Sequence, residues 1–169
     1  MSLSTRRFRG DGMTAEQRTE QTDNSNDDAY EISTDPARLD RALIHAFLSR
    51  ESYWAKRIPF EVVTRSIDHS LNFGAYCDGT QVGYARVITD RATFAFIRDV
   101  FVVTEHRGRG LGRRLTESIL AHPDMQRLRR IMLATRDAHG LYERAGFQPL
   151  ARPELFMVIE ASAKELYGR

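Results

Sequence analysis

The segment Val100–Leu115 (VFVVTEHRGRGLGRRL) most constrains the fold, because it predicts a buried strand that runs through a glycine-rich loop into a helix. Gly108, Gly110 and Gly112 allow the backbone to come close to a ligand. The unpaired amides of the first helical turn direct positive potential outward, so the segment forms a cradle for an anion. The arginines that can add phosphate contacts are Arg107, Arg109, Arg113 and Arg114. The pattern predicts a phosphate or pyrophosphate site without naming the molecule.

The segments around this loop alternate between strand and helix signals, which predicts an α/β (α+β) fold around a mixed sheet. Alternating or continuous apolar runs predict strands over residues 30–33, 72–77, 81–88, 92–103, 130–134 and 155–160. Helical spacing of apolar residues predicts helices over residues 36–49, 58–70, 111–122 and 137–145. Asp78-Gly79, between the second and third strands, predicts a tight hairpin turn.

Residues 1–28 differ in composition from the rest of the 169-residue chain. The stretch EQRTEQTDNSNDD at residues 16–28 contains no apolar residue. Such a stretch cannot bury enough surface to offset the entropy lost on ordering. We therefore predict a disordered N-terminal leader over residues 1–28 and a globular domain over residues 29–169.

Net charge, cysteine content and hydropathy exclude several classes of protein. The 25 basic and 23 acidic residues leave a charge of +2, so we expect no nucleic-acid partner. Cys77 is the single cysteine, which excludes an internal disulfide, and the five histidines lack metal-ligand spacing, so we expect no metal. No run approaches the roughly 18 apolar residues of a membrane span, so we expect a cytoplasmic protein without a membrane partner.

The residue pattern of the glycine loop narrows the choice of phosphate-containing ligand. After a V-x-V strand, Arg107, Gly110 and Gly112 form the pattern R-x-x-G-x-G. This pattern resembles the pyrophosphate loop of the GNAT acyltransferases, [QR]-x-x-G-x-[GA]. It matches neither the Walker loop nor the G-x-G-x-x-G dinucleotide fingerprint.

A second motif follows downstream at a suitable spacing. Ala138, Tyr142 and Gly146-Phe147 match the pattern A-x-x-x-Y-x-x-x-G-F, which closes the GNAT core. Thr135 departs from the family, because many relatives have Asn seven residues before the tyrosine, but its hydroxyl can still bond a backbone group. The resemblance covers roughly residues 30–160, so the predicted globular domain is similar to a GNAT acyltransferase domain.

The resemblance implies a mostly antiparallel mixed sheet with helices on both faces, and acetyl-CoA as the acyl donor. It implies that a primary amine attacks the thioester directly and that Tyr142 protonates the departing CoA thiolate. Loop amides would hold the pyrophosphate, and the end of the preceding strand would pair with the pantetheine arm and polarise the thioester carbonyl. The residues assigned to the donor are Val102, Val103, Thr104, Arg107, Gly108, Arg109, Gly110, Leu111, Gly112 and Arg113.

The attacking amine must lose a proton, and Asp99 is the favoured base, acting directly or through water. It lies on an otherwise apolar face of the predicted strand, so we expect its carboxylate to be poorly solvated. Glu105 and His106 flank the loop and are the second and third choices. A structural ion pair between Asp99 and Arg86 or Arg98 stays an alternative.

The residues assigned to the acceptor are Tyr53, Trp54, Arg86 and Phe101. Ordinary core packing is the favoured interpretation of the aromatic pair, with contact to an acceptor as the alternative. Arg86 can bind a carboxylate or form a structural ion pair. A small-molecule amine is the favoured acceptor because the nearby aromatic residues can enclose a compact pocket. An amine of a peptide or protein is the alternative.

Other interpretations stay open beside the enzyme. A catalytically silent CoA-binding regulatory module would keep the loop but lose turnover. A nucleic-acid-binding protein would use the arginines of the loop and of Arg127–Arg130, which we interpret instead as a solvated turn. A homodimer can form through a sheet edge or through the final strand.

Overall fold

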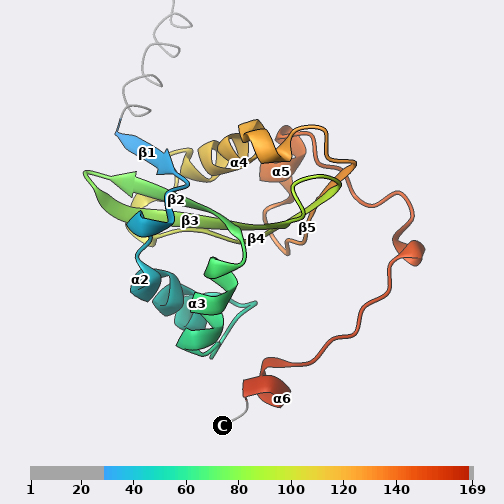
Figure 1. Ribbon diagram of the computed structural model, residues 1–169, viewed down its shortest axis with the longest axis horizontal. Helices are drawn as coiled ribbons and strands as arrows, with labels where there is room; N and C mark the ends of the chain where they lie inside the picture. The colour runs from blue at the N-terminus through green and yellow to red at the C-terminus, as the bar shows by residue number, and fades with distance from the viewer. Residues whose placement is uncertain (1–28, 168–169) are drawn as a thin grey trace, which may run out of the picture.

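The computed structural model describes residues 29–167, which form a five-stranded sheet with helices on both faces (Figure 1). The strands lie side by side in chain order, the first four antiparallel and the last parallel to its neighbour, which confirms the predicted sheet. Their bounds are Tyr30–Ser33 (β1), Leu71–Cys77 (β2), Thr80–Thr89 (β3), Phe94–Val102 (β4) and Arg130–Leu133 (β5). The predicted leader, residues 1–28, lies outside the described residues.

The first four helices pack on the two sides of the sheet and divide the core into two parts, whereas the last helix lies away from the sheet (Figure 1). Their bounds are Arg41–Ala46 (α2), Phe60–Asp68 (α3), Leu111–Ala121 (α4), His139–Arg144 (α5) and Ala163–Tyr167 (α6). Leu111, Leu115 and Ile119 recur at helical spacing and bury one side of α4 against the sheet. Ile44 and Val63 join α2 and α3 to the opposite face. No helix within residues 29–167 has the length and apolar character to cross a membrane.

The helix predicted over residues 36–49 is divided into shorter pieces. Pro36–Arg38 form a separate 3-10 turn. The helix α2 begins after Asp40, whose carboxylate accepts a hydrogen bond from the Leu43 N–H at 2.9 Å. A π-helical turn over Phe47–Glu51 then extends the helical segment past its predicted end. The N-cap gives the backbone a new starting point inside the apolar pattern, which spacing alone does not reveal.

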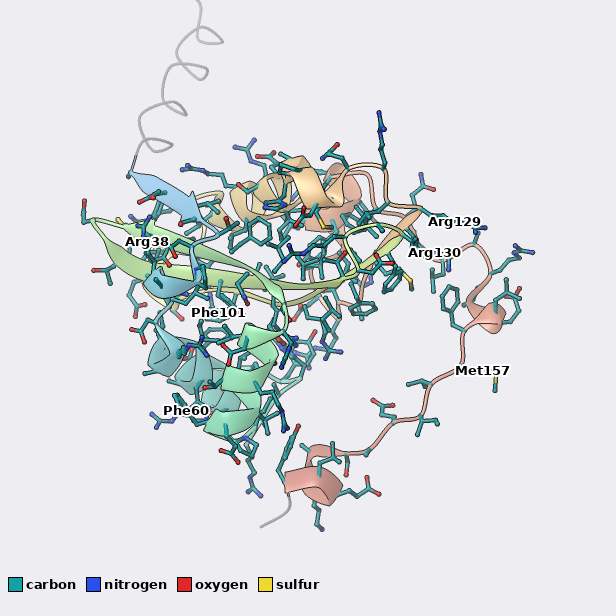
Figure 2. All side chains as sticks on the ribbon, in the orientation of Figure 1. Arg38, Phe60, Phe101, Arg129, Arg130 and Met157 are labelled. Carbon is teal, nitrogen blue, oxygen red and sulfur yellow. The ribbon has the colours of Figure 1, made fainter. Side chains whose placement is uncertain are left out.

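The prediction of a final strand over residues 155–160 is wrong. Pro153–Leu155 form a 3-10 turn, and the residues that follow have no strand partner. Met157 is 99% exposed, and the chain leads away from the sheet toward α6 (Figure 1, Figure 2). The segment is a continuous apolar run and not the alternating pattern expected, and a strand also needs a neighbouring edge that supplies hydrogen bonds.

The strand β4 changes its surroundings half-way along its length. Its first half, Phe94–Ile97, pairs with β3 on one side and with β5 on the other. In its second half, Asp99 and Val100 together lie opposite Ala85 of β3, because the register shifts there. Asp99 has a φ of 54°, in the left-handed region. This is a β-bulge, which bends the strand and leaves one edge of its second half unpaired.

Candidate functional site

The glycine loop ends in a helix N-terminus with unpartnered amides. Gly108 and Gly110 have φ values of 74° and 77°, and a Cβ added at either would meet no atom within 4 Å. Gly110 is the N-cap of α4, and its carbonyl accepts the first helical hydrogen bond, from the Arg114 N–H at 3.1 Å. Because glycine has no side chain, the N–H groups of residues 111–113 stay uncapped beside open space. The arrangement suits an anion that approaches the backbone closely.

The loop arginines have different surroundings. The Arg107 Nε donates to the Val102 carbonyl at 2.8 Å, so this guanidinium lies along β4. Arg113 is exposed and lies 3.7 Å from Glu117, a weak surface pair. Arg109 contacts the Tyr30 hydroxyl at 3.5 Å. Arg107, Arg109 and Arg113 therefore keep their charges around the α4 N-terminus, where they can reinforce its positive potential.

A groove of about 680 Å³ runs from the start of α4 to the free edge of β4. We call it the loop groove; it is lined by the second half of β4, the glycine loop, the start of α4 and one side of α5. Its size falls within the range of sites for small molecules and cofactors. Leu141 and Arg144 also line it, and the sequence analysis missed both. Their i, i+3 spacing on α5, beside the tyrosine motif, is a signal that could have identified them.

The end of β4 presents its backbone to this groove. The Val103 N–H donates to the Val82 carbonyl of β3 at 2.9 Å, so it is not available to a ligand. Successive residues of an antiparallel strand point their amides to opposite sides, so Val102 faces the free edge. Thr104 begins a 3-10 turn over Thr104–His106. Of the three residues assigned to the pantetheine arm, Val102 has the geometry for strand-like pairing.

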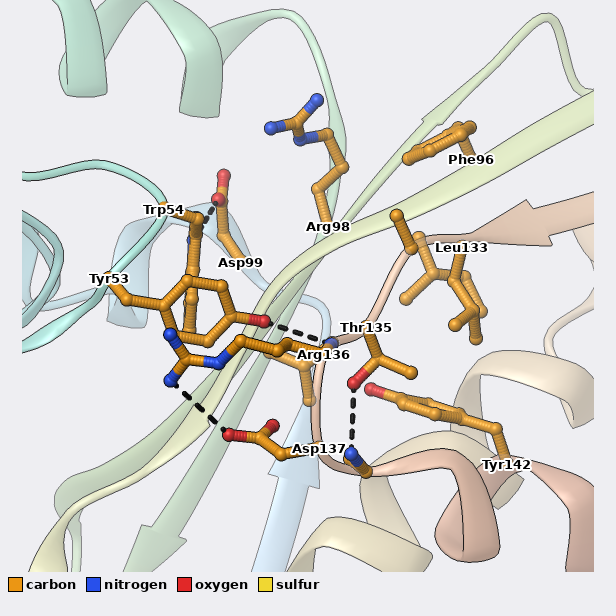
Figure 3. Close-up of a pocket in the computed structure, with 14 residues that line it drawn as sticks. Tyr53, Trp54, Phe96, Arg98, Asp99, Leu133, Thr135, Arg136, Asp137 and Tyr142 are labelled. Atoms are coloured by element: carbon orange, nitrogen blue, oxygen red, sulfur yellow. Dashed lines mark hydrogen bonds and ion pairs between the residues drawn. The ribbon is translucent and has the colours of Figure 1, made fainter. Parts of the chain in front are cut away.

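A second cavity, of about 390 Å³, opens where β4 and β5 separate (Figure 3). We call it the β4–β5 cleft; Arg98 and Asp99 of β4, Leu133 of β5 and residues of the following loop line it. The residues that line both the cleft and the loop groove are Tyr53, Trp54, Val100, Asp137, Ala138 and Tyr142. Because these residues are shared, the two cavities adjoin at the unpaired half of β4.

Tyr53 and Trp54 form an aromatic arch across the opening between β4 and β5 (Figure 3). The Trp54 Nε1 donates to Asp99 Oδ1 at 3.0 Å, while the Tyr53 hydroxyl accepts from the Arg136 N–H at 3.2 Å. The Arg136 guanidinium lies 3.7 Å from the centroid of the Tyr53 ring. With exposed fractions of 41% and 37%, the two residues line cavities, so the favoured prediction of core packing is wrong.

Asp99 forms a buried ion pair with Arg86. The Arg86 Nε donates to Asp99 Oδ2 at 2.7 Å, and the two side chains are 12% and 7% exposed. Arg86 also donates to the Ser70 hydroxyl at 3.2 Å. It lines neither the loop groove nor the cleft, whereas Asp99 lines the cleft. The geometry therefore favours the structural ion pair over the carboxylate-binding role for Arg86.

Tyr142 stands where the cavities meet. It is 8% exposed, yet it lines both the loop groove and the cleft (Figure 3). Burial, with a smaller contribution from nearby Tyr53, raises the pKa of the Tyr142 phenol above its ordinary value of 10. Within residues 29–167 its hydroxyl makes no hydrogen bond to protein. A phenol that stays protonated and unpartnered at neutral pH is suited to donate a proton.

Sequence comparisons identify the family to which this site belongs. A model described as "Acetyltransferase (GNAT) domain" matches residues 68–149. A protein of Gibberella zeae named as an acetyltransferase is 35% identical over 136 residues, which cover 67% of this chain and 75% of that protein. The chain belongs to the GNAT acetyltransferase family.

Solved structures of GNAT acetyltransferases share the fold. A GNAT-family structure from Xanthomonas campestris is 53% identical, with a TM-score of 0.78, over 83% of this chain and 97% of that one. An acetyltransferase structure from Deinococcus radiodurans is 19% identical, with a TM-score of 0.63, over 83% of this chain and 92% of the other. At 19% identity, the match to the Deinococcus structure supports the fold alone. The match to the Xanthomonas structure covers nearly the whole of that related chain.

The departure from the GNAT tyrosine motif is accommodated locally. The Thr135 hydroxyl accepts a hydrogen bond from the Ala138 N–H at 3.0 Å, just before α5. Gly146 ends that helix with a φ of 93°, as expected for a glycine C-cap. The motif therefore positions Tyr142 through backbone geometry that Thr135 can support.

The remaining assigned residues lie at the edges of the GNAT site. Phe101 is buried and stacks on Phe47 with ring centroids 3.9 Å apart, so it forms a wall of the loop groove. Among the alternative bases, Glu105 is exposed, while His106 Nδ1 lies 3.0 Å from the Tyr30 hydroxyl. Neither lines the β4–β5 cleft, so Asp99 is the candidate that does.

Proposed function

We propose that this GNAT acetyltransferase transfers an acetyl group from acetyl-CoA to a primary amine by direct attack. The observation that supports the proposal is the continuity of the two cavities at Tyr142. One contains an uncapped helix N-terminus suited to pyrophosphate, and the other offers a separate route for an acceptor. The two substrates can then approach the same phenol from different sides.

Residues of the loop groove would hold the donor. The amides of residues 111–113 and the side chains of Arg107, Arg113 and Arg144 would bind phosphate oxygens. The Val102 N–H would pair with the pantetheine arm, and another amide of this free edge would polarise the thioester carbonyl. Tyr142 would then donate its proton to the thiolate that leaves.

Asp99 would accept the proton of the attacking ammonium, directly or through water. Its carboxylate already accepts hydrogen bonds from Trp54 and Arg86, which fix its orientation beside the cleft. Two oxygens offer about four lone-pair sites, so acceptor capacity remains. The test is Asp99→Asn, which keeps the size of the side chain; a rate profile against pH that matches the wild type would overturn the assignment.

The cleft favours a small amine that also carries an anionic group. Arg136 is paired with Asp137, and Asp99 with Arg86, so their charges are largely offset. Arg98 is exposed at the cleft, and its guanidinium lies 5.8 Å from the Phe96 ring centroid without an ion pair within residues 29–167. A carboxylate or phosphate on the acceptor would pair with Arg98, while the aromatic arch would contact its apolar part.

Thermal melting of the protein with acetyl-CoA, CoA and ATP tests the donor site first. A ligand at a hundred times its dissociation constant should add about 2.7 kcal/mol to the free energy of unfolding. We expect stabilisation by both CoA species and none by ATP, followed by release of free thiol when a suitable amine is added. Stabilisation without thiol release across small amines and peptides would favour the silent CoA-binding module.

A further inference from the structure

His106 lies at the donor end of the site, where the proposed reaction gives it no role. It ends the 3-10 turn Thr104–His106, directly before Arg107, and it lines the loop groove together with Gly108. It does not line the β4–β5 cleft. A side chain in this position can reach the donor but not the acceptor.

A tyrosine of the edge strand β1 holds one side of the imidazole ring. The Tyr30 hydroxyl lies 3.0 Å from His106 Nδ1, across 76 positions of the chain. The two rings meet edge to face, with centroids 5.7 Å apart and an interplanar angle of 82°. Tyr30 is 5% exposed and belongs to the core that packs under α4. A buried partner that both packs and bonds to the ring fixes the orientation of His106.

Two arginines fasten Tyr30 to the same loop. Arg109 Nη1 donates a long hydrogen bond, 3.5 Å, to the Tyr30 hydroxyl. Arg114 Nη2 donates to the Tyr30 carbonyl at 2.7 Å. The strand β1 is therefore joined to the glycine loop and to the first turn of α4 by side-chain hydrogen bonds as well as by the core.

The hydrogen-bond network determines which nitrogen of His106 carries a proton. A guanidinium has no acceptor, so Arg109 can only donate to the phenol oxygen. The phenol proton of Tyr30 then needs its own acceptor, and among residues 29–167 His106 Nδ1 lies within reach of it. When Nδ1 accepts, the neutral imidazole carries its proton on Nε2, and a charged imidazole carries one there as well. Nε2–H is a donor in either state, and it has no partner within the described residues.

We propose that the Nε2–H of His106 binds a pyrophosphate oxygen of acetyl-CoA and that Tyr30 is the residue that positions it. The inference rests on the proposed function, because it adds a contact to the same donor site. The uncapped amides of residues 111–113 already favour an anion in the loop groove. The non-bridging oxygens of a pyrophosphate offer more lone pairs than these amides can occupy, so a further directed donor finds an acceptor.

Two substitutions of His106 separate the roles of its nitrogens. In His106→Asn the side-chain oxygen replaces Nδ1 as the acceptor for Tyr30, and the donor at the Nε2 position is lost. In His106→Gln the longer side chain carries an amide N–H toward the Nε2 position. By calorimetry with CoA, we expect His106→Asn to raise the dissociation constant about tenfold and His106→Gln to stay within about twofold of the wild type. The matched control is His69→Asn, an exposed histidine outside both cavities, which should change nothing.

The chemistry of the ligand separates a phosphate contact from a structural one. The same variants are titrated with dephospho-CoA, which keeps the pyrophosphate, and with pantetheine, which has no phosphate. The loss in His106→Asn should persist with dephospho-CoA and disappear with pantetheine. An equal loss with pantetheine would show that the substitution disturbs the whole groove, and it would overturn the proposal. Equal affinities of His106→Asn and the wild type for CoA would overturn it as well.

A double-mutant cycle tests the positioning role of Tyr30. Tyr30→Phe removes the hydroxyl and keeps the ring, so we expect CoA to bind about threefold more weakly. Added to His106→Asn, it should weaken binding no further, because Tyr30 acts through His106. Losses that multiply would contradict this role. A wild type that does not bind CoA would overturn the proposed function and this inference with it, whereas wild-type binding that His106→Asn leaves unchanged would overturn this inference alone.

Discussion

The two halves of β4 serve different purposes although they belong to one nine-residue strand. The first half is paired on both edges, and its Ala95 and Ile97 are buried in the core under α4. The second half is paired on one edge, contains a bulge at Asp99 and borders both cavities. A fully paired strand stabilises the fold but offers no free backbone to a ligand. The bulge supplies that free edge at the cost of a strained residue.

The largest effect on catalysis is expected from Tyr142, which lies where the two cavities meet beside the second half of β4. Tyr142→Phe should lower kcat by about 10²–10⁴-fold, equivalent to roughly 2.7–5.4 kcal/mol, because the proton donor is lost. The dissociation constant of acetyl-CoA should stay unchanged. Steady-state kinetics and calorimetry measure the two quantities. Tyr76→Phe on β2 is the control. An equal loss of kcat in that variant would contradict a specific role for Tyr142 as the proton donor.

The pH profile tests the same phenol without a mutation. Burial raises the Tyr142 pKa, so the protonated donor persists to at least pH 10. The decline of kcat that arises from this acid should therefore appear only at more alkaline pH. The contribution of Tyr142 to the free energy of unfolding should be constant below about pH 10. It should fall at higher pH, because the tyrosine ionises at a lower pH in the unfolded chain than in the folded protein. Tyr142→Phe should reduce that alkaline fall.

Alanine substitutions in the two halves compare their contributions to stability. Ile97→Ala, at a buried position of the first half, should lower the free energy of unfolding by about 2–5 kcal/mol, because a core cavity forms. Val100→Ala, at a partly buried position of the second half, should cost about 1 kcal/mol or less. Urea titrations measure both values. Equal losses would show that Val100 is packed as tightly as Ile97 and would contradict its place beside the cavities.

A pair of glycines separates backbone strain from ligand binding. Gly110 and Gly79 have nearly the same φ, 77° and 76°, and open space at the Cβ position. Alanine at either should cost about 1–2 kcal/mol of stability. Only Gly110→Ala should weaken acetyl-CoA binding, by about tenfold or 1.4 kcal/mol, since Gly79 lies in the distant hairpin. A similar loss of affinity in both variants would point to general destabilisation.

The smallest effect is expected for acceptor selection at Arg98. Arg98→Gln should raise KM for a carboxylate-bearing amine by at most about fivefold, the range of an exposed ion pair. The matching amine without the carboxylate should show no change. The KM ratio of the two amines is the measurement, and a ratio unaffected by the substitution would exclude the contact.

Local signals in the sequence determined a large part of this protein. Asp78 and Gly79 both take positive φ in a two-residue hairpin loop, as the dipeptide predicts. The spacing of Gly108 and Gly110 likewise sets up the start of α4, because those backbone angles depend on neighbouring residues alone. The mostly antiparallel mixed sheet follows from the same patterns together with the family resemblance, whereas its strand order was read from the structure.

Tertiary structure decided what depends on residues far apart in the chain. Trp54 contacts Asp99 across 45 positions, and Tyr53 contacts Arg136 across 83, so no local pattern places the aromatic arch over the cleft. The choice of Arg86 as the partner of Asp99 depends on the bulge between β3 and β4. The apolar run in residues 155–160 has the composition of a strand, but pairing also requires the edge of a neighbouring strand. The sequence determines which residues can form these contacts, but only the fold determines which of them meet.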